Sequence, residues 1–466
     1  MNAQQKTTTT TLFSKIDTYL TEGSKNGFSG AIAVVKNDQI IINKGFGMAN
    51  KNTNTQNNPN TIFDIGSNTK QFTSTAILKL VELGKLHLTD SLHSFFNNLP
   101  KDKQEITIHQ LLSHTAGFKD TIGNDFDKIT QKQFFEKLFS SKLIAAPGKK
   151  YSYSNTGYSI LGRIIEIASG LSYETFLQTY LFAPAGMKQT GYLLPTWDRK
   201  QLSRGYNRNV LETDPTITRY EKDGSITWHL KANGGINSTQ NDMLLWLKAL
   251  KNNVIISEES YKKLASPYMA MNTKKTHSYG YGWVINESIS NTLRLSHNGS
   301  NGTFSHTILW YPKKDMYIVF ATNANSSKVE NIAYVVAKIM LDENYTPKPI
   351  KDNIYSFTMS YIKQHSTNTS KKLVSQLKEK YADDFNRGVL NTIGNLLLRS
   401  NENLNWALTL FKMNTQLYPK DGNIWDSLGD GYKANNLNED AIKSYQKAIA
   451  LGNKASQKKL TNILKN

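Results

Sequence analysis

Two apolar runs near the start of the chain and four more around residue 300 alternate with turn residues, as β-strands do. Residues 30–35 and 40–47 flank the polar turn 36–39 and predict a hairpin. The later strands are expected at 279–284, 293–296, 305–311 and 316–322. Because short turns join consecutive runs, we expect one antiparallel sheet that brings the segments near residues 30 and 320 together.

Helical spacing of apolar residues occurs between these strands. It is found at 12–20, at 71–83 before Gly84, from Tyr158 to about Ala168, and from Asn241 to Leu250. Helices that flank an antiparallel sheet, with a further helical cluster, define an α/β (α+β) sandwich, which is the predicted fold class. The intervening residues 190–230 are a long polar insertion, and we expect them to line the wall of a substrate cleft.

The pattern changes after residues 345–350, whose prolines predict a linker. Beyond them the spacing is wholly helical, and residues 425–432 with Ala441, Tyr445 and Ala448 resemble one tetratricopeptide repeat. This helical part either packs as an appendage or docks a peptide or protein partner. The predicted divisions are a flexible N-terminus at 1–11, a main domain at 12–345, a linker at 346–369 and a helical domain at 370–466.

Composition narrows the class of protein. The chain has 466 residues, no cysteine and a net charge of +19. The lack of cysteine excludes disulfides, thiolate metal sites and a cysteine nucleophile. The lysines are scattered and no nucleic-acid motif occurs, so the charge indicates a generic basic surface or attraction to an anionic cell-wall polymer. The sequence contains no run of eighteen or more apolar residues, so it predicts no transmembrane helix.

The first eleven residues are polar and lack the apolar core of a signal peptide. Residues 2–5, Asn-Ala-Gln-Gln, resemble the start of a chain after signal cleavage. If a signal peptide has been removed ahead of them, the protein is exported to the periplasm or cell envelope.

Candidate chemistry begins at Ser67, close to the predicted start of the helix at 71–83. Lys70 follows three residues later, and residues i and i+3 share one face of a helix. An amine with a lowered pKa can take the proton of a serine hydroxyl and activate it as a nucleophile. The alternative is an N-cap serine beside a solvated lysine.

A second candidate group is Tyr153-Ser154-Asn155, on a loop just ahead of a predicted helix. Such residues are often only turn and capping chemistry. Beside an ammonium, however, a phenol loses its proton more easily and can serve as general base and acid. His114 is either a base or, more commonly, a structural hydrogen-bonding group. His297, followed by a glycine-containing turn, either places its imidazole beside a cleft or is an ordinary strand-end histidine.

Three pieces in one order, Ser67-Asn68-Thr69-Lys70, Tyr153-Ser154-Asn155 and His297-Asn298-Gly299, resemble the signature set of the serine β-lactamase and penicillin-binding protein family. The Tyr-Ser-Asn form of the middle piece is similar to the class C branch, which includes D-alanyl-D-alanine peptidases, D-aminopeptidases and esterases. The likeness covers roughly residues 12–345.

The resemblance implies roles for the first two pieces. Ser67 would be the acylated nucleophile and Lys70 the amine that accepts its proton. Tyr153 would be the coupled base that protonates the leaving group and later activates water. Asn155 would orient the substrate amide or ester. No metal or cofactor is implied, and the partner would be a small molecule or short peptide.

The third piece would complete the cleft. His297 and Gly299 would contact the substrate or support Tyr153, and the backbone N–H groups of Ser67 and Ser300 would form an oxyanion hole. Class C β-lactamases carry lysine where this chain has His297. Because histidine is mostly neutral at pH 7, this departure fits the esterase and peptidase branches better than β-lactam hydrolysis.

The leading functional hypothesis is therefore a serine hydrolase that forms an acyl-enzyme on D-amino-acid-containing peptides, amides or small esters. The alternatives are a true β-lactamase and a non-catalytic scaffold that binds peptidoglycan or β-lactams and uses its helical tail.

Overall fold

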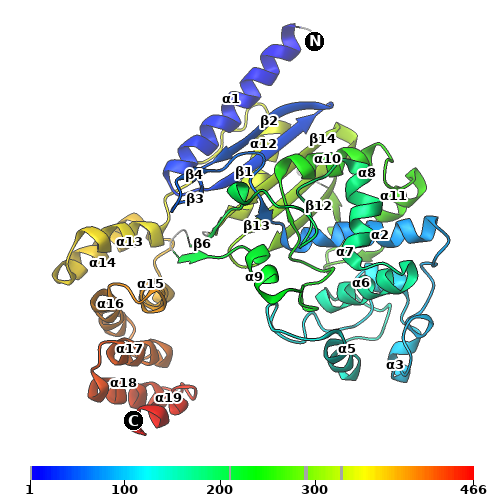
Figure 1. The fold of residues 1–466 in the computed structure, drawn as a ribbon. Helices are drawn as coiled ribbons and strands as arrows, with labels where there is room; N and C mark the ends of the chain where they lie inside the picture. Colours follow the sequence, from blue (N-terminus) through cyan, green and yellow to red (C-terminus); the bar gives the residue numbers. More distant parts are fainter. Residues whose placement is uncertain (1–2, 209–210, 288–291, 326–328, 466) are drawn as a thin grey trace. The chain divides into compact units, whose positions relative to one another are not determined.

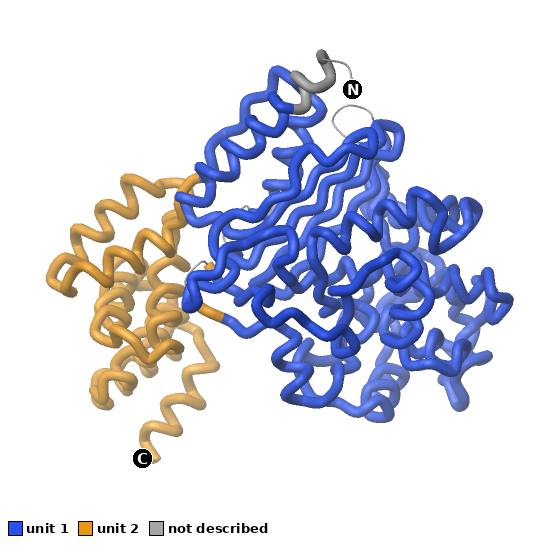
Figure 2. The backbone as a smooth tube through the Cα atoms, turned by 45° about the horizontal axis from the view of Figure 1, so that its top comes forward, with its two compact units in different colours: residues 1–207, 213–350 blue, residues 208–212, 351–466 orange. Residues whose placement is uncertain are grey.

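The structure, a computed structural model, describes residues 3–208, 211–287, 292–325 and 329–465. The chain divides into two compact units (Figure 2). Unit 1 comprises residues 1–207 and 213–350, and unit 2 comprises residues 208–212 and 351–466. Each unit has its own hydrophobic core, so each is described separately.

An eight-stranded sheet forms the centre of unit 1, in the order β2-β1-β14-β13-β12-β11-β10-β9 (Figure 1). Every neighbouring pair is antiparallel, and Gly30 pairs with Thr322, so the predicted sheet is confirmed. The strands are β1 Gly30–Lys36, β2 Gln39–Phe46, β9 Met269–Ala270, β10 His277–Tyr279, β11 Val284–Glu287, β12 Leu293–Ser300, β13 Ser305–Tyr311 and β14 Met316–Thr322.

Alternate residues of the sheet face two different cores, because successive side chains of a strand point to opposite sides. In β1, Ile32 and Val34 belong to the core that includes α1 (Ala3–Lys25) and α12 (Ile332–Leu341), whereas Ala33 and Val35 belong to the larger core on the other face. The sheet is thus covered by helices on both faces, as the predicted sandwich requires (Figure 1).

The larger core holds the elements that carry the candidate site. Phe72 of α2 packs edge-on against Phe182 and Trp246, with ring centroids 4.9 and 4.6 Å apart. The helices of this part are α2 Thr69–Glu82, α3 Lys101–Gln104, α4 Ile108–Leu112, α5 Gln131–Ser140, α6 Asn155–Ser169, α7 Tyr173–Leu177, α8 Ala183–Ala185, α9 Thr216–Asp223, α10 Gln240–Lys251 and α11 Glu258–Leu264. Short strands are β3 Met48–Asn50, β4 Thr55–Gln56, β5 Phe63–Asp64, β6 Gly205–Asn207, β7 Leu211–Thr213, β8 Asn237–Ser238 and β15 Ala324–Asn325.

α1 begins at Ala3, and the flexibility of residues 1–11 stays a prediction. Two details differ from the sequence predictions. Residues 279–284 are not one strand: β10 ends at Tyr279 and β11 begins at Val284, because Gly282 turns the chain with φ +76°. α6 begins three residues earlier than expected, since the Ser154 hydroxyl caps it by accepting the N–H of Gly157.

The C-terminal part of unit 2 is helical, and the apolar faces of its helices form a core around Leu390, Leu397 and Phe411. α13 lies inside the stretch 346–369 that was expected to be a linker. The tetratricopeptide assignment stays a prediction. The helices are α13 Ile354–Gln364, α14 Ser370–Lys380, α15 Arg387–Ser400, α16 Leu404–Leu417, α17 Gly422–Ala434, α18 Asn438–Ala450 and α19 Ser456–Leu464. Across the described residues of both units, no helix combines the length and the apolarity needed to span a bilayer.

Candidate active site

Ser67 is the accessible point of an otherwise buried segment. It lies in the 3-10 turn η1 (Gly66–Asn68), which leads directly into α2. Every other residue from 61 to 70 is buried. The hydroxyl therefore stands at the N-terminal end of a helix, where the peptide dipoles favour developing negative charge.

Lys70 reaches Ser67 from one turn further along. Its Nζ donates to Ser67 Oγ at 3.1 Å, to Asn155 Oδ1 at 2.6 Å and to the carbonyl of Asn233 at 2.7 Å, so all three ammonium hydrogens have acceptors. The side chain is fully buried. Burial lowers the pKa of Lys70 to about 7, against the opposing effect of Asp120 and Asp125. Near neutral pH this amine can therefore be neutral and can accept a proton.

Tyr153 lies over the same ammonium, with its ring centroid 4.7 Å from Lys70 Nζ. Burial raises the pKa of its phenol, and interaction with Ser67 only partly opposes the rise. The phenol therefore keeps its proton near neutral pH and can act as a donor, and its role as the coupled base stays a prediction.

Asn155 is the first residue of α6 and is fixed at two points. Its backbone N–H donates to Asp120 Oδ1 at 3.0 Å, and its side-chain oxygen accepts from Lys70. The N-cap residue Ser154 also donates its hydroxyl to the carbonyl of Lys119 at 3.0 Å. The loop before α6 thus carries Tyr153 and Asn155 to Lys70 in a fixed register.

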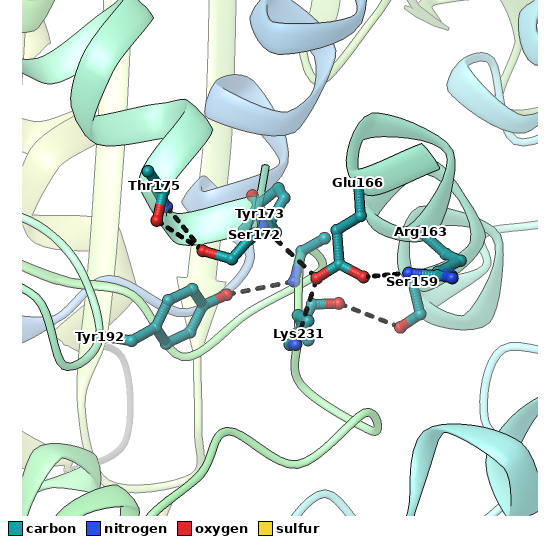
Figure 3. Close-up of polar contacts among 9 residues, drawn as sticks. Ser159, Arg163, Glu166, Ser172, Tyr173, Thr175, Tyr192 and Lys231 are labelled. Atoms are coloured by element: carbon teal, nitrogen blue, oxygen red, sulfur yellow. Dashed lines mark hydrogen bonds and ion pairs between the residues drawn. The ribbon is translucent and has the colours of Figure 1, made fainter. Parts of the chain in front are cut away.

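The segment that presents the Asn233 carbonyl is anchored by a polar network around Glu166 of α6 (Figure 3). Glu166 accepts from Arg163 at 3.0 Å and from Lys231 at 3.4 Å, and Ser159 donates to the Lys231 carbonyl at 3.1 Å. The next residue, Ala232, has φ +68°, a conformation that side chains other than glycine rarely adopt. This network holds the strained backbone against Lys70.

The end of β12 touches η1 backbone to backbone. A Cβ placed on Gly66 would lie 2.5 Å from the nitrogen of Ser300, and a Cβ on Gly299 would lie 1.9 Å from the carbonyl oxygen of Ile65 and 2.8 Å from the nitrogen of Ser67. Both glycines are therefore needed for the approach, and Gly66 also has φ +51°. The predicted oxyanion donors, the N–H groups of Ser67 and Ser300, belong to these two touching segments.

Asp64 connects the same two segments through hydrogen bonds. Its Oδ1 accepts the N–H of Gly66 at 2.7 Å, and its Oδ2 accepts from the side chain of Asn301 at 2.8 Å. The carboxyl is almost completely buried. Burial raises the pKa of Asp64 to about 6, while these hydrogen bonds and one with Thr216 act to lower it. Asp64 thus holds the backbone on both sides of the predicted oxyanion hole.

His297 lies in β12, and both of its ring nitrogens have partners inside the protein. Its Nδ1 lies 2.8 Å from the carbonyl of Asn298, which can only accept, so Nδ1 carries the proton and Nε2 accepts from the Tyr279 hydroxyl at 3.0 Å. The ring is 5% exposed, and burial lowers the pKa of His297 to about 3. It is a neutral hydrogen-bonding group inside the protein.

His114 is structural in this arrangement, the alternative that sequence reasoning favoured. Its Nδ1 accepts the N–H of Ser154 at 3.1 Å, and its carbonyl accepts the N–H of Ser152 at 2.8 Å, so it fixes the backbone on both sides of Tyr153. It does so with φ +56°. Burial holds the pKa of His114 well below its ordinary value.

Sequence reasoning missed Asn233, Asp64 and Asp120 as parts of the site. Their roles depend on contacts between distant segments, and only the neighbouring Gly234-Gly235 pair and the place of Asp64 beside Ser67 hinted at them. Within the part of the chain that the structure describes, no group of three His, Asp or Glu side chains could hold a metal ion.

A buried lysine one turn after a serine, at the start of a helix packed on an antiparallel sheet, defines the β-lactamase and transpeptidase class of proteins. The chain belongs to the Beta-lactamase family, whose profile matches residues 16–339. The match spans unit 1 from α1 to α12 and includes Ser67, Lys70, Tyr153 and His297.

Curated relatives and solved structures agree with this assignment. The chain is 34% identical over 272 residues to PbpX of Bacillus subtilis, whose name groups it with penicillin-binding proteins; the alignment covers 58% of this chain and 65% of that protein. Penicillin-binding protein 4* of Bacillus subtilis is 29% identical over 317 residues, and the alignment covers 65% of this chain and 70% of that protein. The solved structure of the penicillin-binding protein homologue from Pyrococcus abyssi matches with a TM-score of 0.61 at 26% identity. The match covers 75% of this chain and 81% of that chain. The chain thus spans about two thirds of the length of the two Bacillus proteins.

Proposed function

We propose that this protein is a serine hydrolase that works through an acyl-enzyme intermediate on D-amino-acid-containing peptides, amides or small esters. The observation that carries the proposal is the 3.1 Å contact between Lys70 Nζ and Ser67 Oγ, made by a lysine whose pKa burial lowers to about 7. Such a lysine can act as the base that a serine nucleophile requires.

In the acylation step, Ser67 Oγ attacks the substrate carbonyl carbon while its proton passes to Lys70. The oxyanion that forms is stabilised by the N–H groups of Ser67 and Ser300, each typically worth about 3 kcal/mol. Tyr153 donates its proton to the leaving nitrogen or oxygen as the bond to carbon breaks, and the Lys70 ammonium restores that proton. The raised pKa of Tyr153 suits a donor, and Asn155 would orient the substrate carbonyl group.

Deacylation uses water as the nucleophile in place of Ser67. A water molecule attacks the ester carbonyl and transfers a proton to neutral Lys70, and Ser67 leaves as the hydroxyl after taking a proton back. We infer that penicillins acylate Ser67, as the names of the Bacillus relatives suggest for those proteins. We expect slow release, because His297 is buried and neutral where class C β-lactamases carry a lysine.

The test is a substrate panel run on wild type and Ser67→Ala: p-nitrophenyl esters, a D-Ala-D-Ala peptide, a D-aminoacyl amide and a chromogenic cephalosporin. We expect turnover of at least one member by wild type, and loss of both turnover and fluorophosphonate labelling in the variant. Equal labelling of the two proteins would overturn the proposal. Labelling without any turnover would favour the scaffold alternative.

A further inference from the structure

The third acceptor of Lys70 is a backbone carbonyl, so its position depends on the segment 232–234. Lys70 Nζ donates to the Asn233 carbonyl at 2.7 Å. A side-chain acceptor is oriented by its own rotamer, whereas a carbonyl is oriented by the peptide groups on either side of it. The contacts that fix Ala232 and Gly234 therefore determine whether this carbonyl meets the ammonium.

One side chain binds the backbone on both sides of Asn233. The Tyr192 hydroxyl accepts the N–H of Ala232 at 3.2 Å (Figure 3). The same hydroxyl donates to the carbonyl of Gly234 at 2.8 Å. The tyrosine is fully buried, and burial holds the pKa of Tyr192 well above its ordinary value, so the phenol keeps the proton that it donates. Its two hydrogen bonds bridge the ends of the segment 232–234.

Tyr192 is itself fixed through its backbone. Glu174 Oε1 accepts the N–H groups of Tyr192, Leu193 and Leu194 at 2.7, 2.7 and 2.9 Å. The carbonyl of Tyr192 accepts the indole N–H of Trp197 at 3.1 Å. Because the N–H and the carbonyl of this tyrosine are both held, its hydroxyl is a fixed point against which the segment 232–234 is aligned.

The carbonyl of Ala232 is held by the helix that carries Lys70. Thr73 lies three residues after Lys70 on α2, and its hydroxyl donates to the Ala232 carbonyl at 2.6 Å. Since this hydrogen is used, the 2.7 Å contact of Thr73 with Tyr173 is one in which the tyrosine hydroxyl donates. Tyr192 and Thr73 thus bind the two backbone polar groups of a residue with φ +68°, and such a conformation persists only where its surroundings enforce it.

We propose that Tyr192 is a positioning residue whose hydroxyl sets the Asn233 carbonyl against the Lys70 ammonium and so fixes Lys70 beside Ser67. The inference rests on the proposed function, because it concerns the base of that reaction. Tyr192 acts through the segment 232–234 and not on the reacting atoms.

Loss of the hydroxyl should change the acid–base behaviour of Lys70. An acceptor carbonyl favours the charged form of an amine, so the pKa of Lys70 should fall when the Asn233 carbonyl withdraws. The other titratable groups that act on Lys70 are unchanged in such a variant, so a shift can be assigned to the carbonyl. These groups are Asp120, Asp125, His114, Tyr153, Tyr158 and His297.

The test is Tyr192→Phe, which removes only the hydroxyl oxygen. Two profiles are recorded between pH 5.5 and 9. The first is the rate of fluorophosphonate labelling of Ser67. The second is the chemical shift of the Lys70 Cε in protein labelled with carbon-13 lysine, assigned with Lys70→Arg. The second profile requires no catalysis.

Two further variants make the test specific. Thr73→Val releases the carbonyl of Ala232 while Tyr192 is intact, so it should act on Lys70 in the same direction. Tyr311→Phe is the matched control, because it also removes a buried tyrosine hydroxyl, in the core on the opposite face of the sheet.

We expect Tyr192→Phe to move the acid limb of labelling and the Lys70 titration to lower pH by about 0.5, and to lower the labelling rate at the plateau about fivefold. Thr73→Val should move both profiles the same way, and Tyr311→Phe neither. An unmoved Lys70 titration in Tyr192→Phe would refute the role, whatever happens to the plateau. If that variant does not fold, Thr73→Val decides by the same criterion. Equal labelling of wild type and Ser67→Ala would refute the proposed function instead, and the Lys70 titration would still decide the role of Tyr192.

Discussion

The imidazole of His114 lies against the phenol ring of Tyr153, with ring centroids 4.3 Å apart, and its Nδ1 accepts the N–H of the next residue, Ser154. Because Nδ1 accepts, the proton of the neutral ring is on Nε2, which has no hydrogen-bond partner among the described residues. A histidine with φ +56° and an unpaired buried N–H is costly, and it persists where surrounding structure demands it. Here it positions the proton donor.

We predict that His114→Asn lowers kcat about tenfold, since it removes the ring under Tyr153 and the acceptor of a buried N–H. Asparagine tolerates the left-handed backbone, so the melting temperature should change little while kcat falls. The measurement is kcat and KM on a p-nitrophenyl ester, with the exposed His87→Asn as the control. An unchanged kcat in His114→Asn would show that Tyr153 does not depend on this contact.

The acylation rate should rise with pH through a pKa of about 7. Only the neutral amine of Lys70 can accept the Ser67 proton, and burial lowers its pKa to about 7. Below that pH, kcat/KM should fall about tenfold per unit, and above it the profile should level off. Fluorophosphonate labelling rates between pH 5.5 and 9 provide an independent profile. A rise in these rates centred near pH 10 would mean that Lys70 titrates as a solvated amine.

Gly299→Ala should reduce kcat/KM by at least a hundredfold, the scale expected when one oxyanion donor is displaced. The new Cβ would meet the Ile65 carbonyl oxygen at 1.9 Å and force β12 away from η1. The matched control is Gly234→Ala, near the same site, whose Cβ would have only ordinary contacts from 3.4 Å outward. Full activity in Gly299→Ala would show that the oxyanion hole does not depend on the close approach of β12 to η1.

Asp64→Asn should remove part of the pH dependence of stability. Burial raises the pKa of Asp64 to about 6, above its ordinary value of 3.8, so between these values the folded state binds the proton more strongly than the unfolded state. The contribution of this group is therefore fully present below pH 3.8 and is lost as the pH rises through 6, by about 3 kcal/mol. Urea unfolding midpoints of wild type and variant from pH 4 to 7 test the sign. Parallel pH profiles would mean that the carboxyl of Asp64 is not desolvated.

Much of the fold follows from local pattern. The continuous apolar runs at 30–35 and 316–322 give strands that are buried on both faces. The spacing of Ser67 and Lys70 gives their contact, because a helix brings i and i+3 together. Thr107 caps α4 through a capping box with Gln110, as its residue type suggests.

What could not be predicted depends on burial and on distant contacts. The raised pKa of Tyr153 follows from desolvation by burial, which a local sequence pattern does not reveal. The third acceptor of Lys70, the Asn233 carbonyl, is a backbone atom that any residue possesses. His297 has a residue type that suits a substrate contact, and only its partners show that it faces inward.

The contact between η1 and the end of β12 joins two parts of the chain that leave the ribosome far apart in time. Ser67 emerges early, whereas Gly299 and Ser300 emerge more than two hundred residues later. Until then the serine has neither its second oxyanion donor nor the strand that supports its turn. A nascent chain therefore carries an inert hydroxyl, and reactivity appears only once most of unit 1 has been synthesised.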